Sequence, residues 1–108
     1  MRQILLLRHA KSSWDDPELR DFDRPLAKRG KEDAPRMGRF IRSSGYKPAQ
    51  ICSSTAMRAK QTAELFCESA QVDTSGIYWN EELYYGGVND YLDCIREASD
   101  GHEGVVLV

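Results

Sequence analysis

Arg8 and His9 are the first residues of the chain whose side chains together suggest chemistry, because a guanidinium stands directly beside an imidazole. They follow residues 4–7, four consecutive large apolar residues that indicate a short strand buried on both faces, as in parallel sheets. Ligands of open α/β sheets lie just beyond the carboxyl ends of such strands. The pair therefore suggests an anion site, although the dipeptide alone is more typical of a solvated strand exit.

Arg58 provides a second cation at a corresponding position. Residues 49–52 form another apolar stretch that ends in a Ser-Ser-Thr sequence, and Arg58 follows in the predicted first turn of a helix. Ser54 or Thr55 is the expected cap of that helix. Backbone N–H groups and the helix dipole favour an anion at a helix N-terminus. Two strand ends then bring Arg8 and Arg58 to one edge of a sheet.

The elements that position these residues follow from the apolar pattern. Strands are expected at residues 4–7, 49–52, 77–79 and 105–108, and helices at about 33–43, 56–70 and 88–98. Residues 11–24 show no steady period and are predicted to form a long surface loop. This alternation predicts an α/β fold, a three-layer sandwich with a mostly parallel central sheet and helices on both faces.

Pro35 determines where the first helix is expected to begin. Apolar residues at helical spacing support a helix to about residue 43, with Gly45 as its stop; they are Ala34, Met37, Phe40 and Ile41. Proline is tolerated only near the first turn of a helix. The helix is therefore expected either to begin near Asp33 or to be kinked at the proline.

Composition limits the classes of partner. With 108 residues the chain is expected to form one short domain, and a net charge of −2 argues against a general binder of nucleic acid or anionic membranes. No apolar run reaches transmembrane length. Cys52, Cys67 and Cys94 lack metal-ligand spacing, and their odd number without a signal peptide predicts buried thiols and a cytoplasmic location.

Three segments together resemble a known family. They are Leu-Leu-Arg-His-Ala-Lys-Ser at residues 6–12, Asp-Arg-Pro-Leu at residues 23–26 with Gly30, and Ser-Ser-Thr-Ala-Met-Arg-Ala-Lys-Gln-Thr-Ala at residues 53–63. In this combination the chain resembles the histidine phosphatase superfamily, in its SixA-like phosphohistidine phosphatase branch. The resemblance covers essentially the whole chain and implies a phosphoglycerate mutase-like fold.

The resemblance also implies roles for individual residues. His9 would be the nucleophile that is transiently phosphorylated, and Arg8 and Arg58 would bind the phosphoryl oxygens. Imidazole can attack phosphorus and leave again, and guanidinium groups match the phosphoryl oxygens in shape and charge, so the chemistry agrees. Glu82 best fits the family's proton donor, with Glu81 as an alternative; both are also typical of solvated loop carboxylates. No metal or cofactor is expected.

The chain departs from the family pattern at its last strand. The family places a second histidine, in a Gly-His dipeptide, directly after the fourth strand, and Val108 is the last residue here. His102 precedes that strand, so it is expected to be a surface turn residue at the opposite edge of the sheet. The domain, residues 1–108, is accordingly expected to be truncated at its C-terminus.

Ser12 and Arg24 are further candidates for contact with substrate. Ser12 is equally well explained as a hydrogen-bond donor to phosphate or as a turn cap. Arg24 could add a cation near the pocket, although the Asp-Arg-Pro-Leu sequence favours a structural role through an ion pair and a turn. Trp14, Tyr84 and Tyr85 could line the substrate mouth or cover the core.

Two functions from different classes remain open at this stage. The first is a cytoplasmic, metal-independent phosphatase that acts on phosphohistidine in a protein, or on a small phosphate ester, through phosphorylated His9. The second is a phosphate-recognising module with weak or no turnover, which the missing histidine favours. A mutase is disfavoured because Ala10 and Lys11 stand where mutases of the superfamily usually have Gly and then Glu or Gln. The oligomeric state cannot be predicted from these patterns.

Overall fold

A parallel sheet forms the middle layer of the computed structural model, which describes residues 3–46, 48, 50–97 and 104–107. Its strands are β1 (Gln3–Leu6), β2 (Gln50–Ser53), β3 (Ile77–Trp79) and β4 (Gly104–Leu107), in the order β1-β4-β2-β3. Neighbouring strands in this sheet are parallel. Their carboxyl ends therefore meet at one edge, as the sequence predicted.

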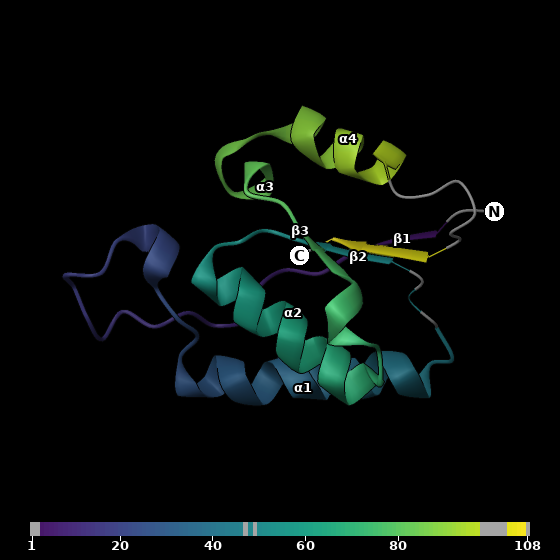
Figure 1. Cartoon of the computed structure of the whole chain (residues 1–108). Helices are drawn as coiled ribbons and strands as arrows, with labels where there is room; N and C mark the ends of the chain where they lie inside the picture. Colours follow the sequence, from purple (N-terminus) through teal and green to yellow (C-terminus); the bar gives the residue numbers. More distant parts are fainter. Residues whose placement is uncertain (1–2, 47, 49, 98–103, 108) are drawn as a thin grey trace.

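Helices cover both faces of the sheet (Figure 1). α1 (Lys28–Ser43) and α2 (Met57–Ala70) lie on one face, whereas α3 (Glu82–Tyr85) and α4 (Val88–Glu97) lie on the other. Two short 3₁₀ turns, η1 (Asp21–Asp23) and η2 (Thr74–Gly76), complete the described elements. The main core lies beneath α2 and contains Ile41, Ile51, Ala59, Ala63, Phe66, Cys67 and Ile77. This arrangement confirms the predicted three-layer α/β sandwich.

β1 does not have the environment that its apolar sequence predicts. It lies at the edge of the described sheet, and its Ile4 and Leu6 side chains are 46% and 73% exposed. Leu5 packs against the main core, because side chains alternate between the two faces of a strand. On the other face, α4 packs over β2, where Cys94 meets Cys52. The expectation of a strand buried on both faces is therefore wrong for the described residues.

α1 begins well before the start predicted from its proline. It runs from Lys28 to Ser43 with Pro35 inside it. The pattern concealed the first turns because Gly30 is the only buried residue among residues 28–33, and glycine gives no apolar signal. The expected start near Asp33 is therefore wrong. The predicted end is confirmed, with Gly45 at a φ of 83° just beyond the helix.

The buried face of α1 combines two glycines with only part of the predicted apolar stripe. A Cβ on Gly38 would overlap the Phe66 carbonyl oxygen of α2, so this glycine lets the two helices approach closely. Ala34 and Ile41 are buried as predicted. Met37 and Phe40 turn partly away from the core, and Phe40 is 66% exposed.

Gly30 is expected to be required for stability. A Cβ at this position would overlap the backbone of Lys11, which leaves β1 on the way to the loop. Ala is the better helix former by about 1 kcal/mol, but forced overlap in a packed region costs about 1–3 kcal/mol. We expect Gly30→Ala to lower the midpoint of urea unfolding. Gly76→Ala, which meets no atom within 4 Å, is the matched control. A Gly30→Ala variant as stable as the control would contradict the predicted overlap.

The start of α2 differs in its cap from the prediction. The N-cap is Ala56, with no side-chain cap, and the Ser54 hydroxyl instead accepts a hydrogen bond from the Ala56 N–H at 3.1 Å. Arg58 nevertheless occupies the second position of the helix, so its predicted place near the N-terminus is confirmed.

Cys52, Cys67 and Cys94 are buried thiols, as predicted. Burial, with the nearby charges of Glu64 and Glu68, raises the pKa of the Cys67 thiol to about 12. These thiols therefore behave as small apolar groups of the core. In the part of the chain that the structure describes, no helix combines the length and the apolar character needed to cross a membrane.

Candidate active site

A cavity of about 590 Å³ opens at the carboxyl edge of the sheet, where the sequence predicted an anion site. Its walls come from the β1 exit, the start of α2, η1 in the loop, α3 and α4. The residues that line it are His9, Asp21, Ser54, Ala56, Arg58, Ala59, Leu83, Tyr84, Tyr85 and Tyr91. The structure therefore brings the predicted nucleophile and Arg58 into one cavity.

The His9 ring is oriented by the backbone beside it. Its Nδ1 lies 2.9 Å from the Ala10 carbonyl oxygen. Because a carbonyl oxygen can only accept a hydrogen bond, this contact requires the proton to be on Nδ1. The neutral ring then keeps its lone pair on Nε2, which is the tautomer that a nucleophilic imidazole needs.

Thr62 connects this backbone to Arg58. The Ala10 N–H donates to the Thr62 hydroxyl at 3.1 Å, and that hydroxyl donates to the Arg58 carbonyl oxygen at 2.7 Å. Thr62 is buried on α2, and its hydrogen bonds were not predicted from the sequence. Thr62 lies one helical turn after Arg58, and this spacing could have indicated the hydrogen bond to the Arg58 carbonyl oxygen. Thr62 thus ties the β1 exit to the first turn of α2.

Arg58 is held by the loop across the cavity. Its Nη1 donates to the Asp21 carbonyl oxygen at 2.7 Å, and its Nη2 donates to the Asp21 carboxylate at 2.9 Å. The guanidinium also lies 5.8 Å from the centre of the Tyr84 ring. With the Arg58 side chain only 15% exposed, this cation is fixed at the wall rather than free in solvent.

Asp21 is a site residue that the sequence analysis missed. Besides Arg58, its carboxylate accepts hydrogen bonds from the Tyr84 hydroxyl at 2.7 Å and from Arg24 Nη1 at 3.1 Å. These bonds, first from Tyr84 and then from Arg58, lower the pKa of Asp21 to about 2. The carboxylate therefore remains ionised at any pH at which the protein would work. The same bond raises the pKa of Tyr84, so its hydroxyl stays protonated.

Arg24 is buried within the loop instead of lining this cavity. Its Nε donates to the Ser13 carbonyl oxygen at 3.0 Å, and its Nη2 donates to the Ser12 hydroxyl at 2.8 Å. The guanidinium also stacks on the Trp14 ring, 3.2 Å from its centre. These contacts agree with the structural role that the sequence favoured. Ser12 lines an adjoining hollow with His9, although its hydroxyl is engaged by Arg24.

We expect Arg24→Ala to destabilise the fold more than any exposed arginine would. The change removes three hydrogen bonds from a side chain that is 6% exposed. Hydrogen bonds from charged groups contribute about 1.5–3 kcal/mol each, so a loss of at least about 2 kcal/mol in the free energy of unfolding is expected. Arg20→Ala, which removes an exposed ion pair to Asp23, is the control. Equal urea midpoints for the two variants would contradict this role.

Arg8 is next to His9 in the chain but does not line the main cavity. Arg8 is exposed, and with His9 it lines two hollows that adjoin the main cavity. One of these also contains Leu6, Val88 and Leu92 and is largely apolar. Arg8 and Arg58 therefore line different hollows, and His9 is common to them.

Glu81 and Glu82 are exposed at the start of α3, and neither lines the cavity. The Glu82 N–H donates to the Asn80 side chain at 3.0 Å, which fixes the turn into the helix. The α3 residues that line the cavity are Leu83, Tyr84 and Tyr85. The assignment of the proton donor stays a prediction.

Aromatic side chains form one wall of the mouth. Phe22 and Tyr84 meet edge to face with ring centres 5.0 Å apart, and Tyr84 meets Tyr85 in the same way at 4.8 Å. Tyr84 and Tyr85 thus line the mouth, one of the two places that the sequence allowed for them.

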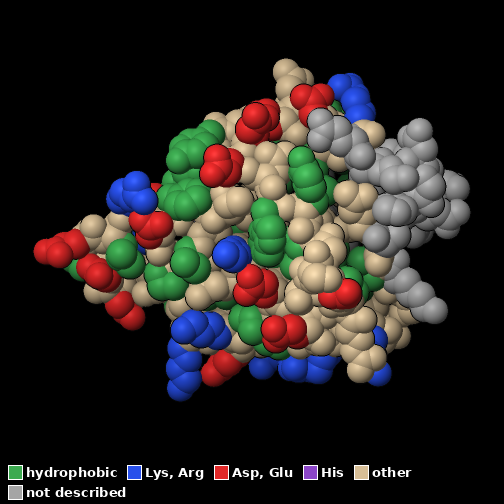
Figure 2. Space-filling model, viewed as in Figure 1, with side chains coloured by type: hydrophobic (Ala, Val, Ile, Leu, Met, Phe, Trp, Pro, Cys, Tyr) green, Lys and Arg blue, Asp and Glu red, His purple; other side chains and the backbone are tan. Residues whose placement is uncertain are grey.

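Charged side chains of both signs lie on the surface outside the cavity (Figure 2). The tip of the loop carries exposed acidic side chains, Asp15, Asp16 and Glu18, and acidic groups gather at the corresponding left end of Figure 2. Basic side chains lie along the lower edge, where α1 runs. Cations lie closer to the imidazole, because Arg58 lines the cavity, and Arg8, Lys11 and Arg29 line an adjoining hollow with His9. Within the described residues, no three His, Cys, Asp or Glu side chains are grouped as a metal site.

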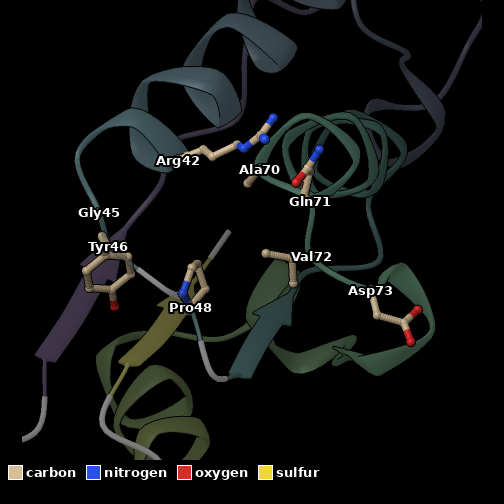
Figure 3. A pocket seen from close by; sticks show the side chains of 8 residues that line it. All are labelled: Arg42, Gly45, Tyr46, Pro48, Ala70, Gln71, Val72 and Asp73. Carbon is tan, nitrogen blue, oxygen red and sulfur yellow. The ribbon is translucent and has the colours of Figure 1, made fainter.

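A second cavity of about 460 Å³ lies at the amino ends of β2 and β3 (Figure 3). Its walls include Arg42, Tyr46, Gln71 and Val72. It contains none of the residues that the sequence singled out for chemistry, and it is separated from His9 by the length of the strands. His102, expected to be a surface turn residue, lies outside the described residues.

Comparison with known proteins identifies the family. Residues 4–103 match the histidine phosphatase superfamily (branch 1). The chain belongs to this superfamily. The matched residues include Arg8, His9 and Arg58, and the family predicted from the sequence motifs is confirmed.

Solved histidine phosphatase structures support the SixA-like branch. A phosphohistidine phosphatase candidate, SixA, from Agrobacterium tumefaciens is 35% identical, with a TM-score of 0.85, over 97% of this chain and 66% of that one. The corresponding SixA from Nakamurella multipartitia is 30% identical, with a TM-score of 0.81, over 99% of this chain and 58% of that one.

Curated relatives are longer than this chain. An uncharacterized chloroplastic protein of Arabidopsis thaliana is 49% identical over 72 residues, which are 67% of this chain and 32% of that protein. A 2,3-bisphosphoglycerate-dependent phosphoglycerate mutase of Thermobifida fusca is 33% identical over 99% of this chain and 45% of that protein. The matched parts of this histidine phosphatase chain thus cover 32% and 45% of the lengths of these two relatives.

Proposed function

We propose that this protein is a phosphatase that removes phosphoryl groups from phosphohistidine in a protein, or from a small phosphate ester, through a phosphohistidine intermediate on His9. The observation that carries the proposal is the His9 ring, oriented through Nδ1 by the Ala10 carbonyl, in the same cavity as a fixed Arg58. Similarity to SixA proteins supports the same substrate class.

The reaction then proceeds in two displacements. In the first, His9 Nε2 forms a bond to phosphorus while the bond between phosphorus and the leaving nitrogen or oxygen breaks, and the leaving atom takes up a proton. In the second, water attacks the phosphorylated imidazole, and inorganic phosphate and the free ring are released. The covalent step divides one difficult hydrolysis into two easier reactions. Nothing in this scheme requires a metal ion or a cofactor.

Arg8 and Arg58 are assigned to the phosphoryl oxygens. Both guanidinium groups can stabilise the negative charge that spreads over these oxygens during transfer. We assign proton donation to Glu82, with Glu81 as the alternative, and this requires α3 to move its exposed carboxylate toward the mouth. Ser12 is assigned to substrate through the adjoining hollow. Arg24 contributes by holding Ser12 and Asp21 in place.

The test is to trap the intermediate. The protein is mixed with phosphoramidate or a phosphohistidine peptide, quenched at alkaline pH because phosphohistidine is acid-labile, and digested for mass spectrometry. We expect one phosphoryl group on the peptide that contains His9, lost on brief acid treatment. Turnover with no label on His9, or a label on another residue, would contradict the proposal. Phosphate binding without turnover or label would favour the alternative, a phosphate-recognising module.

The proposal extends to the setting of the protein. Three buried cysteine thiols suit a reducing compartment such as the cytoplasm. The partner would be a phosphorylated protein or small molecule, and neither a nucleic acid nor a membrane is assigned as a ligand.

A further inference from the structure

Asp21 joins three parts of the site that are far apart in the sequence. It belongs to η1 in the long loop, and its carboxylate accepts hydrogen bonds from Arg58 of α2 and Tyr84 of α3. Its second carboxylate oxygen accepts from Arg24, which is itself fixed to the loop backbone. A single side chain therefore links the loop, the first turn of α2 and the aromatic wall of the cavity.

The contact with Arg58 leaves that residue able to bind a second anion. An arginine side chain carries five N–H groups. Asp21 takes one hydrogen bond from Nη1 and one from Nη2, so three N–H groups of Arg58 remain, including the one on Nε. Since Asp21 holds two nitrogens of the planar group, the direction of the remaining N–H groups is set before substrate arrives.

The charge of Asp21 acts against simple anion binding. A carboxylate beside a phosphate-binding cation partly cancels its field, so it weakens the attraction for any anion in the cavity. A site that only had to capture phosphate would be improved by its removal. The value of the carboxylate must lie in orientation, which matters most where bonds to phosphorus are forming and breaking.

We propose that Asp21 is a positioning residue of this site, which aims the free N–H groups of Arg58 at the phosphoryl group during transfer while it lowers affinity for the bound ground state. This inference rests on the proposed function, since it takes the cavity beside His9 as the place of transfer. Tyr84 supports Asp21 by donating its hydroxyl to the same carboxylate oxygen as Arg58.

Asp21→Asn tests this role by removing the charge at nearly constant shape. We expect kcat to fall about tenfold or more, because misplacement of a positioned group costs up to about a hundredfold. Inhibition by vanadate, which resembles five-coordinate phosphorus, should weaken about tenfold. Inhibition by inorganic phosphate should be unchanged or stronger, because a neighbouring negative charge has been removed. If Asp21 had a purely structural role, the variant would bind both vanadate and inorganic phosphate more weakly.

Asp23→Asn is the matched control. Asp23 lies two residues away in the same turn and pairs with the exposed Arg20, so its kcat and both inhibition constants should match the wild type. Melting temperatures are measured for every variant. The positioning role is wrong if Asp21→Asn leaves kcat and vanadate affinity within twofold of the wild type. It is also wrong if the variant has a higher kcat and binds both vanadate and inorganic phosphate more tightly.

Tyr84→Phe provides a second test that leaves Asp21 in place. The change removes one donor to the carboxylate, so we expect a smaller fall in kcat of a few fold. Combined with Asp21→Asn it should add nothing further, since both changes act through one contact. Fully additive effects would contradict the link. Vanadate binding can also be measured by calorimetry without turnover, so unchanged vanadate affinity in Asp21→Asn would refute the positioning role even in a protein whose catalysis failed.

Discussion

His9→Ala is expected to abolish turnover while the fold and much of the anion site remain. Removal of the nucleophile from a covalent mechanism lowers kcat by roughly a thousandfold or more. The imidazole contacts only the neighbouring Ala10 carbonyl by hydrogen bonding among the described residues, so its loss leaves the Thr62 and Arg58 connections intact. Steady-state hydrolysis of phosphoramidate, with binding of inorganic phosphate measured by calorimetry, separates the two effects.

His102→Ala is the control for this prediction. It removes the other histidine of the chain, which precedes the fourth strand in the sequence and is not assigned to the site. We expect its kcat to match the wild type. If His9→Ala kept full activity, the nucleophile assignment would fail. Equal losses in the two variants would show that histidine substitution, rather than loss of the nucleophile, damages the protein.

The location of the site could be predicted because it follows from topology. Parallel strands place their carboxyl ends at one edge, so His9 and Arg58 were expected to lie near each other, and both line one cavity, whereas Arg8 lines adjoining hollows. The apolar patterns of the helices and strands were strong enough to predict the alternation of these elements along the chain. The prediction was less successful for burial, since a run of apolar residues looks the same in an edge strand as in a central one, and β1 proved to be at the edge.

The contacts of Asp21 could not be predicted from the sequence. Its partners Arg58 and Tyr84 lie 37 and 63 residues away, and the loop that carries Asp21 has no periodic pattern. Asp21 is one of several acidic residues in that loop, and nothing in composition separates it from the exposed Asp15 and Asp16. Only the folded path of residues 11–24 brings it across the cavity. Contacts of this kind depend on tertiary structure, whereas Arg24 carried a local signal in its Asp-Arg-Pro-Leu sequence.

Arg58→Ala is expected to damage both binding and rate, which distinguishes it from the variants of Asp21. The change removes a cation that lies beside His9 and is held before substrate arrives. Loss of one such donor costs about a hundredfold to a thousandfold in kcat. It also leaves the Asp21 carboxylate facing the cavity without its partner, so inorganic phosphate should bind at least tenfold more weakly.

Arg58→Lys tests why the residue must be an arginine. A lysine keeps the charge but is a compact group with no planar fork, so it cannot hold two Asp21 oxygens and two phosphoryl oxygens in fixed directions. We therefore expect recovery of phosphate affinity with little recovery of kcat. Arg96→Ala, which removes an exposed partner of Asp93 on α4, should leave both quantities unchanged. Unchanged phosphate affinity in Arg58→Ala would exclude Arg58 from the anion site, whereas full recovery of kcat in Arg58→Lys would mean that its charge alone matters and that Asp21 has no direction to impose.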